Sequence, residues 1–137
     1  MDDTQLLRYS RHLLLDALGP DAQERFAAGR ALVVGVGGLG NPAAQFLASA
    51  GVGRITLVDA DSVDLTNLQR QILFSMDDVG APKVEAAARR LAAINPEPDY
   101  VGVARRVGPG ELVALAADAD VVLDCTDNFA TRHAINR

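Results

Sequence analysis

The sequence predicts an α/β fold: a Rossmann-like, doubly wound parallel sheet preceded by N-terminal helices. Short apolar runs typical of buried strands alternate with helical segments, and this alternation favours a parallel sheet covered on both faces. A glycine-rich turn follows the first of these runs, where such a sheet binds a nucleotide. Because crossovers between parallel strands are right-handed, we expect four strands in the order 3-2-1-4, half of a full doubly wound sheet.

The expected elements are assigned from periodicity, glycine stops and proline positions. Helices are expected over residues 3–15, 21–28, 39–50, 83–94, 109–117 and 129–137. Strands are expected over residues 31–34, 54–59, 100–104 and 120–125, all buried. Residues 61–80 show no clean periodicity, and a stretch of this length without regular structure is often functional. We therefore divide the chain into N-terminal helices, 1–29, and a nucleotide-binding domain, 30–137, that is truncated at its C-terminal end.

The composition excludes several classes of protein. A chain of 137 residues with 49% hydrophobic residues has the size of one globular domain. A net charge of −5 argues against a partner that is duplex nucleic acid. No apolar run reaches the ~20 residues of a membrane span, and the acidic start is wrong for a signal peptide, so we expect a cytoplasmic protein. The single cysteine, Cys125, excludes an internal disulfide and a zinc site made only of this chain's cysteines.

The glycine-rich turn after residues 31–34 predicts a phosphate-binding loop. Gly35, Gly37 and Gly40 fit the pattern G-x-G-x-x-G, and Gly38 adds a fourth glycine. Glycines at this spacing let the backbone approach phosphates, while the following helix directs its free N–H groups toward them. The loop predicts a nucleotide but does not say which one.

Two acidic residues follow the second expected strand. Asp59 lies about 20 residues beyond the glycine loop, where dinucleotide folds place the carboxylate that binds ribose. Asp61 is either a second contact or a turn residue. These features alone also fit an NAD(P)-dependent oxidoreductase, which remains an alternative.

Cations further along the chain favour a triphosphate over a nicotinamide. Residues 67–71, Asn-Leu-Gln-Arg-Gln, place amides and the Arg70 guanidinium near the expected crevice. Lys83 follows Pro82 at the start of a helix, where a cation opposes the macrodipole by ~0.3–1 kcal/mol. A bound anion would explain a cation there, although a solvated lysine or arginine is the simpler alternative for each.

The fourth expected strand leads into Thr126-Asp127-Asn128. Asp127 either caps the following helix or holds Mg²⁺ through an oxygen ligand beside the phosphates, and its position allows both. Cys125 is predicted to be a structural thiol, because burial raises the pKa of a thiol.

Taken together, these segments strongly resemble the ThiF/MoeB/HesA adenylyltransferases, the bacterial relatives of ubiquitin-activating enzymes. The resemblance covers essentially the whole chain. The matching motifs are RYSRH at 8–12, GVGGLG at 35–40, ASAGVG at 48–53, DAD at 59–61, NLQRQ at 67–71, PK at 82–83, INP at 94–96 and DCTDN at 124–128.

The resemblance implies that Mg-ATP is bound and that the C-terminal glycine of a small ubiquitin-like sulfur carrier, of the ThiS or MoaD type, is adenylylated. Thiamine or molybdopterin biosynthesis would use the product. The implied nucleotide contacts are Gly35, Gly37, Gly38, Gly40, Asp59, Asp61, Thr66, Asn67, Leu68, Gln69, Arg70, Lys83, Asp127 and Asn128. The implied catalytic residues are Arg11, Arg70, Lys83 and Asp127, with Asp127 supporting Mg²⁺ and Arg11 reaching the partner subunit's ATP across a homodimer.

Sequences of this family continue well past the position of Arg137. They add strands, a carrier-binding groove, two Cys-x-x-Cys pairs for structural zinc and often a reactive cysteine. We therefore expect this chain to be the ATP-binding fragment, with carrier binding impaired. A non-catalytic partner subunit is a further alternative, against which Arg70, Lys83 and Asp127 argue. The sequence does not distinguish the two carriers, although 67–74 and 127–132 lean toward the thiamine type.

Overall fold

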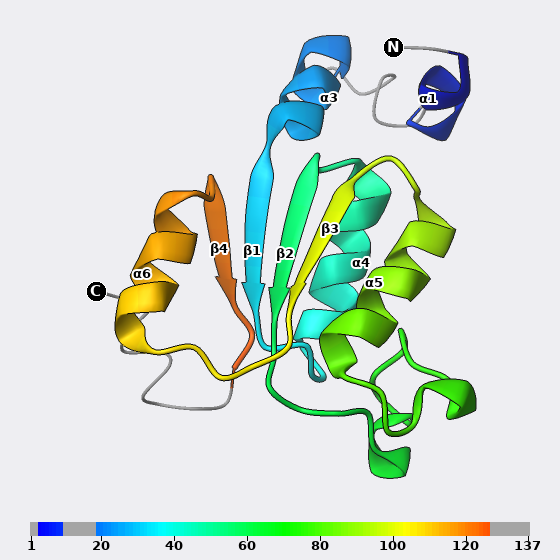
Figure 1. The fold of residues 1–137 in the computed structure, drawn as a ribbon. Coiled ribbons are helices and arrows are strands. Elements are labelled where there is room, and N and C mark those ends of the chain that lie inside the picture. Colours follow the sequence, from blue (N-terminus) through cyan, green and yellow to red (C-terminus); the bar gives the residue numbers. More distant parts are fainter. Residues whose placement is uncertain (1–2, 10–18, 127–137) are drawn as a thin grey trace.

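The sheet has the predicted order. The computed structural model describes residues 3–9 and 19–126 and contains four parallel strands in the order β3-β2-β1-β4. The strands are β1 (Arg30–Val34), β2 (Arg54–Val58), β3 (Asp99–Val103) and β4 (Val121–Asp124). Val34 lies opposite both Val58 and Asp124, so the carboxyl ends of β1, β2 and β4 meet at one edge (Figure 1).

Four of the five described helices follow the predicted bounds to within two residues, whereas the first ends at Arg8, before a turn at Tyr9, although its expected range was 3–15. They are α1 (Asp3–Arg8), α3 (Gly19–Ala28), α4 (Gly40–Ala50), α5 (Lys83–Ile94) and α6 (Pro109–Ala117). Two single-turn 3₁₀ helices, η1 (Leu65–Asn67) and η2 (Met76–Asp78), lie in the segment without periodicity. The expected helix at 129–137 lies outside the described residues. Among the described helices, none has both the length and the apolar composition needed to cross a bilayer.

Each face of the sheet has its own core. On one face, Val33, Ile55 and Leu57 pack with buried residues of α4 and α5. On the other face, Leu32, Val34 and Val58 pack with Leu112 of α6, which lies beside β4 in Figure 1. Apolar residues at successive positions of β1 are therefore all buried, as expected for a strand covered on both faces.

Both edge strands are less buried than predicted. In β3, Asp99, Val101 and Gly102 are exposed; in β4, Val121 is 44% exposed and the other residues are half-buried. The reason is position: in the described sheet β3 pairs with β2 alone and β4 with β1 alone. Apolar composition predicts a strand, but not whether a neighbour covers both of its sides.

A polar cluster closes the amino end of the sheet. Asn95, 1% exposed, donates its side-chain N–H groups to Ala48 O at 2.7 Å and to Tyr9 Oη at 2.9 Å. Tyr100 Oη donates to Asn95 O at 2.6 Å, and burial raises the pKa of Tyr100 to about 12. These bonds join the residue after α1 to α4, α5 and β3, far from the carboxyl ends of the strands.

Candidate nucleotide-binding site

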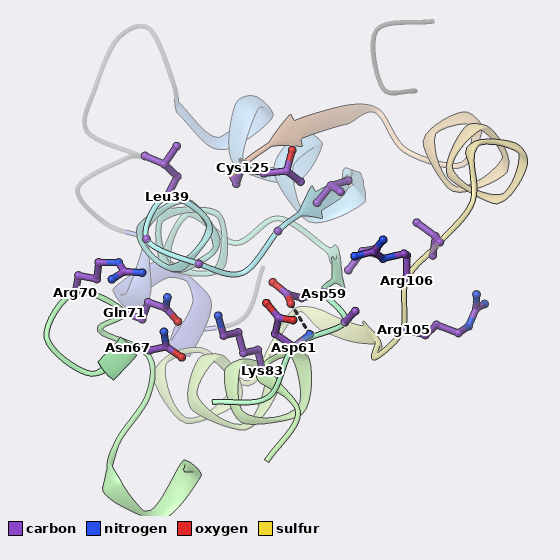
Figure 2. A pocket seen from close by; sticks show the side chains of 18 residues that line it. Leu39, Asp59, Asp61, Asn67, Arg70, Gln71, Lys83, Arg105, Arg106 and Cys125 are labelled. Carbon is purple, nitrogen blue, oxygen red and sulfur yellow. Dashed lines mark hydrogen bonds between the residues drawn. The ribbon is translucent and has the colours of Figure 1, made fainter. Parts of the chain in front are cut away.

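A cavity of about 660 Å³ lies at the carboxyl ends of β1, β2 and β4. This volume is within the usual range for small-molecule sites, and the position is where open parallel sheets bind ligands. It brings together eight residues predicted to bind nucleotide: Gly35, Gly37, Gly38, Asp59, Asp61, Asn67, Arg70 and Lys83. Figure 2 shows the charged and amide side chains among them arranged around one space.

The glycine loop has a backbone that other residues could not adopt. Gly35 has φ +95°, a conformation favourable only for glycine, and its N–H donates to Val58 O at 2.8 Å. A Cβ atom at Gly40 would lie 1.9 Å from Gly35 O. Glycine at these two positions therefore lets the chain turn tightly from β1 into α4.

This turn leaves backbone donors available. In the part of the chain that the structure describes, the N–H groups from Gly37 to Gly40 donate to no protein acceptor. Unpaired N–H groups at a helix N-terminus, together with the positive end of the helix dipole, form a binding site for an anion. The loop therefore offers free backbone donors at the place where its glycines predict a phosphate site.

Asp59 organises the loop from the neighbouring strand. Its Oδ2 accepts the N–H of Val36 at 2.8 Å. Its Oδ1 accepts the N–H of Asp61 at 2.8 Å, the bond dashed in Figure 2. Each carboxylate oxygen can accept a second hydrogen bond. Asp59 can thus bind ribose hydroxyls while it holds the loop, and Asp61 lies at the cavity wall beside it.

Lys83 is a buried cation at the cavity. It is 6% exposed, is the first residue of α5 and is the only lysine in the sequence. Among the described residues it forms no ion pair. An unpaired buried charge is costly, and the N-terminal end of α5 adds to the cost. A bound phosphate would offset both terms.

The 3₁₀ turn before Arg70 fixes the position of the neighbouring side chains. Asp64 Oδ1 accepts the N–H and the hydroxyl of Thr66, while Asn67 Oδ1 accepts the N–H of Asp64. The bond from the Thr66 N–H is the main reason that the pKa of Asp64 lies below its ordinary value. The Arg70 side chain extends toward the glycine loop: its Nε lies 3.6 Å from the position that a Cβ atom would take at Gly38.

The sequence predictions missed Gln71 as a site residue. Gln71 lines the cavity and is 1% exposed. Among the described residues, its Oε1 is the one buried side-chain nitrogen or oxygen atom without a hydrogen-bond partner. A buried polar atom without a partner is costly, and the place of Gln71 in the cavity wall makes its amide a candidate contact for a ligand. Its place in the run at 67–71 was visible in the sequence, but its burial was not.

Arg105 and Arg106 were also missed; both line the cavity after β3. Arg105 forms a bidentate pair with Glu111, and these hydrogen bonds hold the pKa of Glu111 below its ordinary value. Arg106 is exposed. Two adjacent cations just after an expected strand end were the available signal.

The remaining predicted residues divide into two groups. Gly40, Thr66, Leu68 and Gln69 do not line the cavity: Gly40 lies at the start of α4, the Thr66 hydroxyl is bonded to Asp64, Leu68 packs on the core and Gln69 is exposed. Arg11, Asp127 and Asn128 lie outside the described residues.

Cys125 lies at the cavity wall in the expected chemical state. It is half-buried. Burial is the main cause that raises the pKa of its thiol, and the negative charge of Asp124 raises it further. A protonated thiol is a weak nucleophile, which agrees with the predicted structural role. Within residues 3–9 and 19–126 there is no group of three acidic, histidine or cysteine residues able to hold a metal ion.

Comparison with known proteins agrees with the glycine loop and the polar cavity. Residues 9–137 match the ThiF family. The chain belongs to this family. It is 49% identical over 136 residues to the molybdopterin-synthase adenylyltransferase of Escherichia coli K12, covering 99% of this chain and 55% of that protein. It is 47% identical over 136 residues to the sulfur carrier protein ThiS adenylyltransferase of the same organism, covering 99% and 54%.

A solved structure supports the assignment of a nucleotide site. The E. coli tRNA N6-threonylcarbamoyladenosine dehydratase TcdA, in complex with ATP, superposes with a TM-score of 0.90 at 36% identity. The match covers 98% of this chain and 55% of that one. This ThiF-family chain therefore spans about half the length of the relatives it matches.

Proposed function

We propose that this ThiF-family chain is the ATP-binding part of an enzyme that adenylylates the C-terminal glycine of a small ubiquitin-like sulfur carrier. The proposal depends most on Lys83, a buried cation that forms no ion pair within residues 3–9 and 19–126 and that lies in the same cavity as the glycine loop. The names of two similar proteins, both adenylyltransferases, supply the reaction class. The ATP complex of TcdA supports ATP as the nucleotide.

The residues suit displacement at phosphorus. The carrier carboxylate forms a bond to the α-phosphorus of ATP, and the bond from that phosphorus to the bridging oxygen breaks, releasing pyrophosphate. Such a step requires positioning and charge stabilisation more than a protein nucleophile. Asp59 would hold the ribose, the loop N–H groups and Lys83 the phosphates, and Arg70 the charge on the leaving pyrophosphate. Asn67 and Gln71 would complete the polar wall.

Residues outside the described ranges complete the proposal. Asp127 directly follows Thr126, which lines the cavity, and its carboxylate is a suitable ligand for Mg²⁺. Mg²⁺ would neutralise part of the phosphate charge. We further propose a cytoplasmic homodimer in which Arg11 reaches the ATP of the partner subunit. The carrier would belong to thiamine or molybdopterin biosynthesis.

The single lysine allows a direct test. An amine-acylating reagent has two targets in the chain, Lys83 and the α-amino group. We expect 1 mM Mg-ATP to protect Lys83 while the α-amino group, an internal control, reacts at an unchanged rate in mass spectrometry. Equal labelling of Lys83 with and without ATP would contradict the proposal.

Titration calorimetry separates the ligands. We expect heat of binding with Mg-ATP and none with NAD; binding of NAD without a response to ATP would support the oxidoreductase alternative instead. ATP–pyrophosphate exchange with a carrier ending in Gly-Gly then tests the reaction. Exchange independent of the carrier would contradict carrier adenylylation while leaving ATP binding intact.

A further inference from the structure

One buried asparagine connects the two halves of the cavity wall. Asn41 is the second residue of α4 and is 0% exposed. Its Nδ2 donates to Val36 O and to Gly37 O, both at 3.0 Å. Its Oδ1 accepts the N–H of Leu73 at 2.8 Å. The amide therefore binds the glycine loop with one end and the 61–80 segment with the other.

The bonds to the loop determine its electrostatics. Carbonyl oxygens of a phosphate-binding loop would repel a bound anion if they faced it. By donating to Val36 O and Gly37 O, Asn41 holds these two negative ends toward the interior. The Val36 peptide is held at its other end by Asp59, which accepts its N–H. Fixing these carbonyls leaves the following N–H groups, from Gly37 to Gly40, as the charge that a ligand meets.

The bond to Leu73 orders the opposite wall. Leu73 is two residues after Gln71 and three after Arg70, both of which line the cavity. Gln71 O accepts the N–H of Phe74 at 3.2 Å, so residues 71–74 form a turn. A displacement of Leu73 would therefore move Gln71 and Arg70 relative to the glycine loop.

We propose that Asn41 is a positioning residue for the nucleotide phosphates: it turns the loop carbonyls away from them and sets the distance between the loop and the segment that carries Arg70 and Gln71. The proposal rests on the proposed binding of ATP. Asn41 would not touch the ligand, because its side chain is fully buried and all three of its hydrogen bonds go to the protein.

The chain contains a matched control. Asn95 is 1% exposed, donates two hydrogen bonds, to Ala48 O and Tyr9 Oη, and accepts the N–H of Glu97. It thus has the burial and the hydrogen-bond pattern of Asn41, but it lies at the amino end of the sheet. Replacing either asparagine by alanine removes one buried amide together with its three side-chain hydrogen bonds.

The test compares Asn41→Ala with Asn95→Ala in the full chain. Thermal unfolding is measured first, and we expect both variants to lose stability. Calorimetry then gives the Kd for Mg-ATP and for adenosine, which lacks phosphates. We expect Asn41→Ala to raise the Kd for Mg-ATP by about tenfold, because the groups that bind the phosphates are misplaced. The Kd for adenosine should change by less than about twofold. Asn95→Ala should change neither ligand by more than about twofold at a temperature where it is folded.

Asn41→Asp provides a second variant of the same shape. Its carboxylate still accepts the Leu73 N–H but cannot donate to the loop carbonyls, and we expect a larger loss of ATP affinity than in Asn41→Ala. The inference would be overturned if Asn41→Ala lowered the affinity for ATP and for adenosine equally. It would also be overturned if Asn41→Ala and Asn95→Ala lowered the affinity for ATP equally. Wild-type protein that binds no ATP would instead overturn the proposed function, and the inference with it.

Discussion

The two ends of the sheet differ in whether all of their buried polar side chains are paired. At the amino end, Asn95, Tyr9 and Tyr100 form hydrogen bonds with one another and with backbone carbonyls. At the carboxyl end, Lys83 has no ion pair, and Gln71 Oε1 has no hydrogen-bond partner, among the described residues. Paired groups stabilise the fold, whereas unpaired buried groups cost free energy that a ligand can recover. The contrast agrees with the position of the cavity, and it does not depend on any sequence motif.

The largest expected effect is on Lys83. Lys83→Met keeps the length of the side chain and removes its charge, and we expect ATP affinity and adenylylation to fall by about a thousandfold, as when a preorganised electrostatic contact is lost. We also expect the melting temperature to stay the same or to rise, because an unpaired buried charge is removed.

Arg89→Met is the control for Lys83→Met. It removes a cation from the same helix, but Arg89 faces Asp78 on the surface. ATP affinity should not change. A marked fall in the melting temperature of Lys83→Met would mean that Lys83 supports the fold, and the contrast between the two ends would fail.

The second prediction concerns glycines that act alike at both ends. A Cβ atom added to Gly40, at the carboxyl end, would lie 1.9 Å from Gly35 O. A Cβ atom added to Gly53, at the amino end, would lie 1.9 Å from Ala27 O. Because backbone atoms must move in each case, Gly40→Ala and Gly53→Ala should each lower the free energy of unfolding by about 3 kcal/mol. Chemical denaturation measures both values.

Gly110 serves as the control for these glycines, because no atom lies within 4 Å of its Cβ position. Gly110→Ala lies within α6 and should change stability by no more than about 1 kcal/mol. If Gly40→Ala were as mild as Gly110→Ala, the close turn from β1 into α4 would be wrong.

The third prediction tests the paired end through pH. The pKa of Tyr100 is raised to about 12 from 10.0, so folding favours the neutral phenol. The resulting stability is fully present below pH 10 and is lost as the pH rises toward 12. At pH 8, the free energy of unfolding of Tyr100→Phe should be about 1–2 kcal/mol below that of wild type. Between pH 9 and 11, the variant should lose less stability than wild type does. Parallel denaturation curves at the three pH values measure this; an identical pH dependence in both proteins would contradict it.

The smallest effect is expected for the surface ion pairs at the amino end. Asp118 contacts Arg30 at 2.7 Å and Arg54 at 3.8 Å, with side chains between 41% and 63% exposed. Such pairs contribute about 0–1 kcal/mol. Asp118→Asn should therefore shift the denaturation midpoint only slightly and in a salt-dependent manner, without affecting ATP binding. A loss comparable to Tyr100→Phe would show that exposed charges matter as much as buried pairs at this end.

Much of the fold was predictable because its signals are local. Apolar runs, proline positions and glycine stops define β1, α4 and α5, and the handedness of crossovers then gives the strand order. The carboxyl-end rule placed Gly35, Asp59 and Thr126 at one cavity. The exposure of β4 could not be predicted, because composition does not say which strands have neighbours. The roles of Thr66 and Asn67 as partners in a 3₁₀ cap were also not visible in the sequence.

The sequence by itself determined the order of elements, the glycine loop and the chemical types of residue at the site, since these depend on periodicity and on backbone freedom. Only the tertiary structure decided which polar groups are paired. Asn95 follows the predicted helix at 83–94, and only the structure shows that its buried side chain bonds to Ala48 and Tyr9. Asn41 matches no sequence signal, yet it joins the glycine loop to residues 61–80. Burial and hydrogen-bond partners come from segments that are distant along the chain. Only the folded structure therefore decides whether the polar atoms of an amide are paired within the protein or remain unpaired.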